Sequence, residues 1–404
     1  MKAVMYGGGN IGRGFIGMLL SNSGYEVTFV DVVDAVIENL NKNHTYPVRI
    51  IRTGGHEDIQ VQNVCAVDGK NPAAVAEAIA TTDIMATAVG VNVLKFIIPN
   101  IASGIKLRKE RNLGPLNIII CENLMDANKV IEGMLKEHLN AEEQAWMDEN
   151  IGLVEASIGR MVPVQTEAMK DGDPMRVCVE SYGYLPVDKD AFKGEIPQIR
   201  NMVPFAPFDF YLKRKLYVHN MGHATCAYLG DLLGLDYIYQ AIDKDEIYII
   251  VRGAMEESAR ALSMKYGVAL EEITKHIVDL LNRFTNAALG DTCQRVGGDP
   301  ARKLSPADRL IGSSKLAMEM GLTPAYIAIG AAAGLHRYLK ETDGVEQTLP
   351  HAAAVLAVHC ELPADGALAK MILNMYQMIL DGATLQQLRR AADALIAENL
   401  NNVI

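Results

Sequence analysis

Between Lys213 and His223 the sequence carries a base, an amide and an imidazole at spacings that one helix can present to one cleft. At about 100° per residue, Lys215, Asn220 and His223 fall within about 140° of one another. Oxidising a secondary alcohol needs a base for the hydroxyl proton and hydrogen-bond donors for the oxygen that gains negative charge. A lysine can be that base where burial or a neighbouring cation lowers its pKa. We therefore expect Lys215 to be the base, Asn220 the oxyanion donor, and His223 a group that orients the substrate or assists proton movement.

A metal site is one alternative for the same stretch. His219 and His223 are four residues apart, a spacing that zinc sites use. No HExxH pattern accompanies them, and the six cysteines of the chain contain no CxxC pair. We therefore expect no metal, and we expect His219 to pack near the cleft. A solvated polar face is the other alternative, because lysine and histidine on a helix surface are usually just hydrated.

A glycine-rich turn near the N-terminus predicts a dinucleotide site. Residues 7–12 read GGGNIG, which fits G-x-G-x-x-G directly after an expected strand and at the start of an expected helix. Asp31 ends the next expected strand, 19 residues after Gly12, where its carboxylate can bind the ribose of NAD and would repel the 2′-phosphate of NADP. A turn that binds nothing would not explain this register, so we expect NAD as the cofactor. The residues expected to contact it are Gly7, Gly8, Gly9, Asn10, Ile11, Gly12, Arg13 and Asp31.

Hydrophobic periodicity predicts an α/β domain followed by an all-α domain. In residues 1–205, short β-rich runs alternate with helical stretches, the pattern of a doubly wound parallel sheet of the Rossmann type. The expected strands are 3–6, 26–31, 84–88, 116–121 and 176–184, and a helix is expected at 11–23. In residues 206–404, helical segments dominate, among them 245–266, 270–285, 324–339 and 384–399. We expect the first domain to bind NAD and the second to hold the substrate and the catalytic groups.

Composition excludes several classes of function. The chain has 404 residues, of which 22% are charged, and a formal net charge of −11, which argues against binding to nucleic acid or to anionic membranes. The first expected strand begins at Ala3, and no apolar run is as long as a membrane span, so we expect neither a signal peptide nor a transmembrane helix. We expect a cytoplasmic protein that acts on a small molecule. We also expect a monomer, since no coiled-coil pattern stands out.

Several separate motifs occur in one order along the chain. They are GGGNIGRG at 7–14, CEN at 121–123, DKDAFKGEIP at 188–197, K-x4-N-x2-H at 215–223, GAMEES at 253–258, and RKLS with DRL within 302–310. Together they resemble the motifs of the polyol-specific long-chain dehydrogenases, the mannitol dehydrogenase family. The resemblance spans most of the chain, and the ordered set is far more specific than any one motif.

The resemblance implies a metal-independent mechanism, in which Lys215 is the general base while Asn220 and Asn123 together hold the oxyanion. It also implies a helical C-terminal domain like that of 6-phosphogluconate dehydrogenases. The GRGF run at residues 12–15 favours the branch of the family that uses phosphate esters. The expected reaction is the reversible, NAD-dependent oxidation of mannitol 1-phosphate to fructose 6-phosphate.

Because the sequence departs from the family pattern at two positions, related substrates remain as alternatives. Gly159 stands before Arg160 where the family usually has an acid, and His219 stands where it usually has an aliphatic residue. One alternative is a related polyol or sugar-acid dehydrogenase, of the mannitol 2-dehydrogenase or fructuronate reductase type. Another is a protein that binds NAD without turnover. A phosphate ester needs cationic partners. The candidates are Lys193, Lys213, Arg302, Lys303, Arg309 and Arg160.

Overall fold

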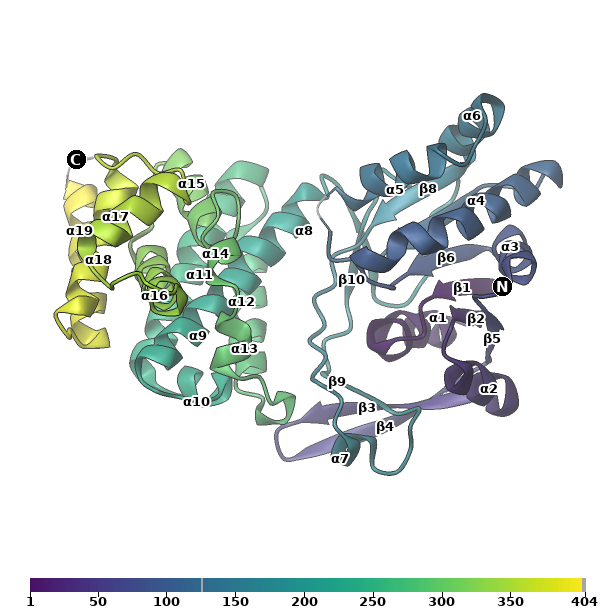
Figure 1. Ribbon diagram of the computed structural model, residues 1–404, viewed down its shortest axis with the longest axis horizontal. Coiled ribbons are helices and arrows are strands. Elements are labelled where there is room, and N and C mark those ends of the chain that lie inside the picture. Colours follow the sequence, from purple (N-terminus) through teal and green to yellow (C-terminus); the bar gives the residue numbers. More distant parts are fainter. Residues whose placement is uncertain (125, 402–404) are drawn as a thin grey trace. The chain divides into compact units, whose positions relative to one another are not determined.

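In the computed structural model, which describes residues 1–124 and 126–401, strand β1 (Lys2–Tyr6) lies inside a six-stranded parallel sheet (Figure 1). The strand order is β5-β2-β1-β6-β7-β8. The other strands are β2 (Glu26–Asp31), β5 (Val64–Asp68), β6 (Ile84–Thr87), β7 (Leu116–Ile120) and β8 (Ile151–Glu155). The chain builds outward from β1 in one direction through β2 and β5, and then in the other through β6, β7 and β8. This reversal is the switch point of a doubly wound sheet, so the predicted fold class is confirmed for the first half of the chain.

Both faces of this sheet are buried, because side chains alternate along each strand. Ala3 and Met5 of β1 pack into one hydrophobic cluster, whereas Val4 and Tyr6 pack into another. The helices of this half are α1 (Met18–Asn22), α2 (Asp34–Asn43), α3 (Pro72–Ala80), α4 (Leu94–Glu110), α5 (Ala127–Lys136), α6 (Ala141–Asn150) and α7 (Glu167–Lys170). Helix α1 contributes to the first cluster, and α3, α4, α5 and α6 contribute to the second.

Two smaller sheets lie beside the main one, and the sequence did not predict them. Strand β3 (Thr45–Arg52) pairs antiparallel with β4 (Gly55–Gln62) and parallel with β9 (Val177–Val179). Strands β10 (Leu185–Asp188) and β11 (Met202–Phe205) form a parallel pair. The predicted strand 176–184 was too long. The chain leaves the sheet at Glu180, whose buried carboxylate accepts the backbone N–H of Met161.

From Asp209 onward the described chain is helical, with one isolated bridge between Tyr237 and Thr292. Its helices are α8 (Asp209–Arg214), α9 (Met221–Leu232), α10 (Ile238–Ile242), α11 (Asp245–Tyr266), α12 (Leu270–Phe284), α13 (Cys293–Gly297), α14 (Pro300–Lys303), α15 (Ile311–Glu319), α16 (Ala325–Glu341), α17 (Leu349–Val358), α18 (Ala367–Leu380) and α19 (Leu385–Asn401). The four predicted helices are confirmed as α11, α12, α16 and α19, although α16 begins at Ala325, one residue after the expected start. Among the described helices none is both long and apolar enough to cross a membrane.

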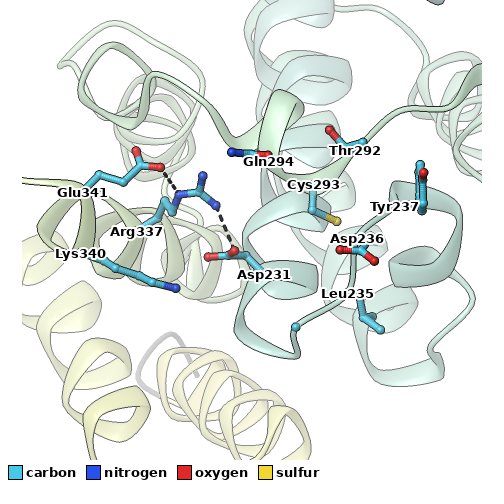
Figure 2. Close-up of a pocket in the computed structure, with 11 residues that line it drawn as sticks. Asp231, Leu235, Asp236, Tyr237, Thr292, Cys293, Gln294, Arg337, Lys340 and Glu341 are labelled. Carbon is cyan, nitrogen blue, oxygen red and sulfur yellow. Dashed lines mark hydrogen bonds and ion pairs between the residues drawn. The ribbon is translucent and has the colours of Figure 1, made fainter.

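Contacts divide the chain into two units, Met1–Asp209 and Phe210–Ile404. The second unit contains a pocket of about 550 Å³ between the end of α9, the start of α13 and the end of α16 (Figure 2). Within it, Arg337 is held by Asp231 at 3.0 Å and by Glu341 at 2.5 Å. None of the residues that the sequence assigned to a site lines this pocket.

Candidate functional site

The glycine-rich turn follows β1 at the switch point of the sheet. Gly7 has a φ of +103°, and a Cβ there would lie 2.5 Å from the carbonyl oxygen of Ala88. Only glycine tolerates both the left-handed backbone and this close approach. A Cβ on Gly12 would collide with the carbonyl oxygen of Gly7, so the helix that follows can start directly above β1. Gly9 is exposed and has open space where a side chain would be. A pyrophosphate could therefore approach the backbone at Gly9.

Asp31 lies against this turn. One carboxylate oxygen of Asp31 accepts the N–H of Gly8 at 2.6 Å, and the other accepts those of Val32 at 2.7 Å and Val33 at 2.9 Å. A Cβ on Gly8 would lie 2.9 Å from the Asp31 carboxylate, so glycine is needed there for the two to meet. The structure thus brings the predicted carboxylate to the predicted turn.

Arg13 has a structural role that the sequence did not predict. Its Nε donates to the carbonyl of Gly8 at 2.7 Å, and a terminal nitrogen donates to the carbonyl of Met175 at 2.6 Å. The side chain is only 8% exposed. Arg13 therefore braces the turn from inside the protein, whereas Asn10 is exposed and Ile11 is partly buried.

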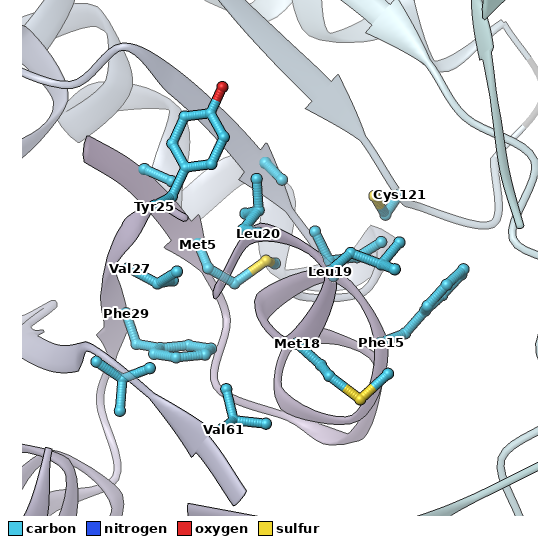
Figure 3. Close-up of a cluster of buried hydrophobic side chains, with 14 of the residues drawn as sticks. Met5, Phe15, Met18, Leu19, Leu20, Tyr25, Val27, Phe29, Val61 and Cys121 are labelled. Atoms are coloured by element: carbon cyan, nitrogen blue, oxygen red, sulfur yellow. The ribbon is translucent and has the colours of Figure 1, made fainter. Parts of the chain in front are cut away.

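The helix after the turn is fixed by the core shown in Figure 3. It begins as a π-helical turn, η1 (Gly12–Gly17), in which Phe15 is fully buried, and continues into α1, where Met18 and Leu19 pack with Met5 and Phe29. This packing sets the N-terminus of the helix at the carboxyl end of β1. Free N–H groups at that end favour an anion.

Glu122, to which the sequence analysis gave no role, connects the carboxyl ends of β6 and β7, the strands on one side of the switch point. Its carboxylate, 7% exposed, accepts the N–H of Val89 at 2.9 Å and that of Gly90 at 2.8 Å. These residues follow β6, whereas Glu122 follows β7. The next residue, Asn123, is exposed. An acid two residues after the end of a buried parallel strand is the sequence signal that could have identified it.

In the second unit, Lys215 and Asn220 are the first and last residues of a π-helical turn, η3 (Lys215–Asn220), between α8 and α9. The sequence-based spacing assumed an α-helix. A π-turn closes its hydrogen bond five residues along the chain instead of four. Residues 215 and 220 therefore lie on nearly the same face, closer than the expected 140°. Such turns occur mostly inside α-helices and often at functional sites.

Lys215 is prepared for proton transfer. It is partly buried, and its Nζ has no hydrogen-bond or ion-pair partner among the described residues. Burial, and next to it the positive charge of Arg309, lower the pKa of Lys215 from 10.5 to about 8. About one tenth of this amine is therefore neutral at pH 7, far more than for a lysine at its ordinary pKa, and a general base reacts in this neutral form.

His223 is held in its neutral form. Its ring stacks on Phe284 with 4.7 Å between the centroids, and its Nε2 lies 3.5 Å from a carboxylate oxygen of Asp291. Burial and nearby cations, Arg295 foremost, lower its pKa to about 3. The buried Nε2 has no hydrogen-bond partner within the described parts of the chain, so it is available for a hydrogen bond to a ligand. Asp291 lies 68 positions after His223, and no sequence signal connected them.

His219 is buried with its pKa lowered well below 6.5, first by burial, and its ring centroid is 6.1 Å from that of His223. Across residues 1–124 and 126–401, no group of three or more His, Cys, Asp or Glu could hold a metal ion.

Four of the cations proposed for a phosphate already have other partners, and two of these, Arg302 and Arg309, pair with nearby acids. Arg160 donates to the carbonyls of Gly14, at 2.8 Å, and of Tyr182, and its guanidinium lies over the ring of Phe15. Lys213 lies 3.4 Å from the hydroxyl of Tyr217 and over its ring.

The departure at residue 159 has a steric reason. A Cβ on Gly159 would lie 3.0 Å from the ring of Tyr182, which occupies the space that an acidic side chain would need.

Comparison with known proteins covers both units. Residues 1–201 match the family model described as the mannitol dehydrogenase Rossmann domain, and residues 208–389 match that of the mannitol dehydrogenase C-terminal domain. A protein of Brevibacillus brevis named mannitol-1-phosphate 5-dehydrogenase is 41% identical over 335 residues, which are 83% of this chain and 86% of that protein.

Two solved structures share the fold. D-sorbitol dehydrogenase in its substrate-free form has a TM-score of 0.78 at 16% identity and covers 94% of this chain and 93% of its own. Pseudomonas fluorescens mannitol 2-dehydrogenase, in a ternary complex with NAD and D-mannitol, has a TM-score of 0.72 at 15% identity. The match covers 97% of this chain and 94% of that one. At these identities the likeness concerns the fold alone.

Proposed function

The chain belongs to the mannitol dehydrogenase family, and we propose that it catalyses the reversible, NAD-dependent oxidation of mannitol 1-phosphate to fructose 6-phosphate. The name of the relative from Brevibacillus brevis supports this choice of substrate. The observation that carries the chemistry is Lys215, a partly buried amine with no acceptor among the described residues, whose pKa is lowered to about 8.

In the proposed mechanism, the neutral Lys215 amine accepts the proton of the substrate hydroxyl. The side-chain amide of Asn220 donates to the oxygen that gains negative charge, and by family resemblance Asn123 is a second donor. His223 is neutral, so its ring can bind a substrate hydroxyl without adding a charge. Bound NAD would supply the acceptor for the hydride that leaves the carbon bearing this hydroxyl. In the reverse direction the protonated lysine returns the proton to the carbonyl oxygen. No metal takes part in the proposed steps.

The glycine turn and Asp31 fit NAD. The exposed backbone at Gly9 and Asn10 suits the pyrophosphate, and the residues proposed to hold the cofactor are those expected from the sequence at 7–12 together with Asp31. The Asp31 carboxylate would accept hydrogen bonds from the adenosine ribose and repel a 2′-phosphate. In this assignment Arg13 supports the turn rather than contacting the phosphates, because its guanidinium is bound to backbone carbonyls.

The same proposal assigns cofactor binding to residues 1–205 and substrate binding with catalysis to residues 206–404. We further propose that the protein acts in the cytoplasm as a monomer. Sedimentation equilibrium of the purified protein measures the second point, and a dimer mass would contradict it.

Replacing Lys215 with methionine tests the mechanism. The variant should lose turnover by about 10²–10⁴-fold, the usual contribution of general acid–base catalysis, and still bind NADH in a fluorescence titration. Lys275→Met is the matched control, since that side chain is 72% exposed and pairs only with Glu271 in the described chain. Full activity of Lys215→Met would refute the assignment of the base. Loss of NADH binding as well would show a damaged fold.

A further inference from the structure

We propose that Lys303 and Arg309 form the subsite that binds the phosphate group of the substrate and thereby select the phosphate ester over the free sugar. This inference rests on the proposed function and names the residues that give it its substrate class. It depends on contacts within the second unit alone.

Lys303 is a buried cation whose two neighbouring acids pair with arginines instead. It is the last residue of α14 and is only 5% exposed, and its Nζ has no hydrogen-bond or ion-pair partner among the residues that the structure describes. The two nearby acids are engaged by arginines. Asp299 pairs with Arg302 at 2.7 Å, and Asp308 pairs with Arg309 at 2.7 Å and with Arg302 at 3.6 Å. An unpaired buried ammonium is costly, and an anionic ligand would compensate it.

Arg309 presents the rest of a phosphate clamp. Its side chain is 12% exposed, and its Nε is bound to Asp308. In the described chain no acceptor contacts its two terminal nitrogens, which form the fork that matches two oxygens of a phosphate. Lys303 and Arg309 lie close enough that the charge of Arg309 lowers the pKa of Lys303, second only to burial.

This pair lies beside the groups assigned to catalysis. The hydroxyl of Tyr217, within η3, donates to the carbonyl of Ala307 at 3.1 Å, which ties the segment before Arg309 to the turn that holds Lys215. The charge of Arg309 also acts on the pKa of Lys215 and, with that of Lys303, on the pKa of His223. This contact and these charge effects place the pair in the same part of the second unit as Lys215 and His223.

Lys303→Met tests the subsite, because methionine has a similar shape and no charge. We expect kcat/KM for NADH-dependent reduction of fructose 6-phosphate to fall on the order of 10- to 100-fold, the range for one hydrogen bond to a charged group, mostly through KM. The kcat/KM for fructose should not change, and Lys303→Arg should restore most of the loss on the phosphate ester. The control is Lys275→Met, which removes an exposed cation of the same unit. An unchanged ratio between the two sugars, or an equal loss on both, would overturn the proposal.

A binding measurement separates this inference from the proposed function. With NADH present, inorganic phosphate should raise the Tm of the wild type and of Lys275→Met. Lys303→Met should have a higher Tm than the wild type without phosphate, since an uncompensated buried charge has been removed, and should not respond to phosphate. This result would support the subsite even if neither ketose were reduced, in which case the proposed function alone would fail. A phosphate response retained in Lys303→Met would refute the subsite whatever the enzyme's activity.

Discussion

The lowered pKa of Lys215 predicts how the reaction depends on pH. Oxidation needs the neutral amine, and reduction needs the protonated one. With a pKa of about 8, kcat/KM for oxidation should rise from pH 7 and level off above pH 9, whereas kcat/KM for reduction should be highest at pH 7 and fall through pH 8. The second ionisation of a phosphate ester lies near pH ~6, below this window, so it does not disturb the profile.

The size of the effect follows from the titration. A group with this pKa is about one tenth neutral at pH 7, about half at pH 8 and about nine tenths at pH 9, so oxidation should gain about 10-fold and then level off. A lysine at its ordinary pKa would instead give about 100-fold over the same range without a plateau. The shape of the curve therefore distinguishes the two cases.

The variant Arg309→Met, measured in the same pH profile, tests whether the charge of Arg309 lowers the pKa of Lys215. Arg309 is the charged residue that lowers the pKa of Lys215, so its removal should move the midpoint of the oxidation profile to higher pH. Arg302→Met removes the same charge from a side chain that is 54% exposed, and it should leave the midpoint in place. The assay is initial-rate formation of NADH from pH 7 to pH 10. A midpoint near 10, or one that does not respond to Arg309→Met, would refute the reasoning.

Three further predictions concern the supporting residues. Asp31→Ser should lower kcat/KM for NADH on the order of 10-fold and raise the NADPH to NADH preference, because a charged acceptor for the ribose is replaced; an unchanged preference in steady-state assays would contradict this role. Glu122→Gln leaves one acceptor for the two N–H groups of Val89 and Gly90, so it should raise KM for NADH and lower kcat about 10-fold with little change in Tm; a fall in Tm with unchanged kinetics would indicate a structural role only. Burial raises the pKa of Glu257 to about 8, so its contribution to stability is fully present below pH ~4.5 and is lost as pH rises through 8, by on the order of 4 kcal/mol. Glu257→Gln should therefore gain Tm relative to the wild type between pH 5 and pH 9, and parallel Tm curves would exclude this ionisation.

Structural features formed by residues close together in the sequence were predictable. The turn at 7–12 and Asp31 belong to one strand–helix–strand unit, whose geometry is set by local periodicity, and the structure places the carboxylate on the N–H of Gly8. The long helices of the second unit were predictable for the same reason. In α12, for example, Ile273, Ile277 and Leu280 recur at helical spacing and are all buried.

Other features depend on packing that the sequence does not encode locally. Strand β4 reads GHEDIQVQ, and its first four residues are exposed and include no large apolar side chain, so the alternation that marks a strand is limited to its last four residues. The π-helical form of η3 changes which residues share a face of the helix, and no residue type in this segment predicts it. Asp291 reaches His223 from a distant segment, and Arg13 turns inward to backbone carbonyls although its sequence position suggested a phosphate contact.

The central claim is that this chain transfers hydride between NAD and a hexitol phosphate. It is tested most directly by the rate of NADH consumption with fructose 6-phosphate and with fructose, measured side by side with a chelator and no added metal. The account predicts rapid consumption with fructose 6-phosphate and little with fructose. Activity on fructose alone, or dependence on added metal, would contradict it.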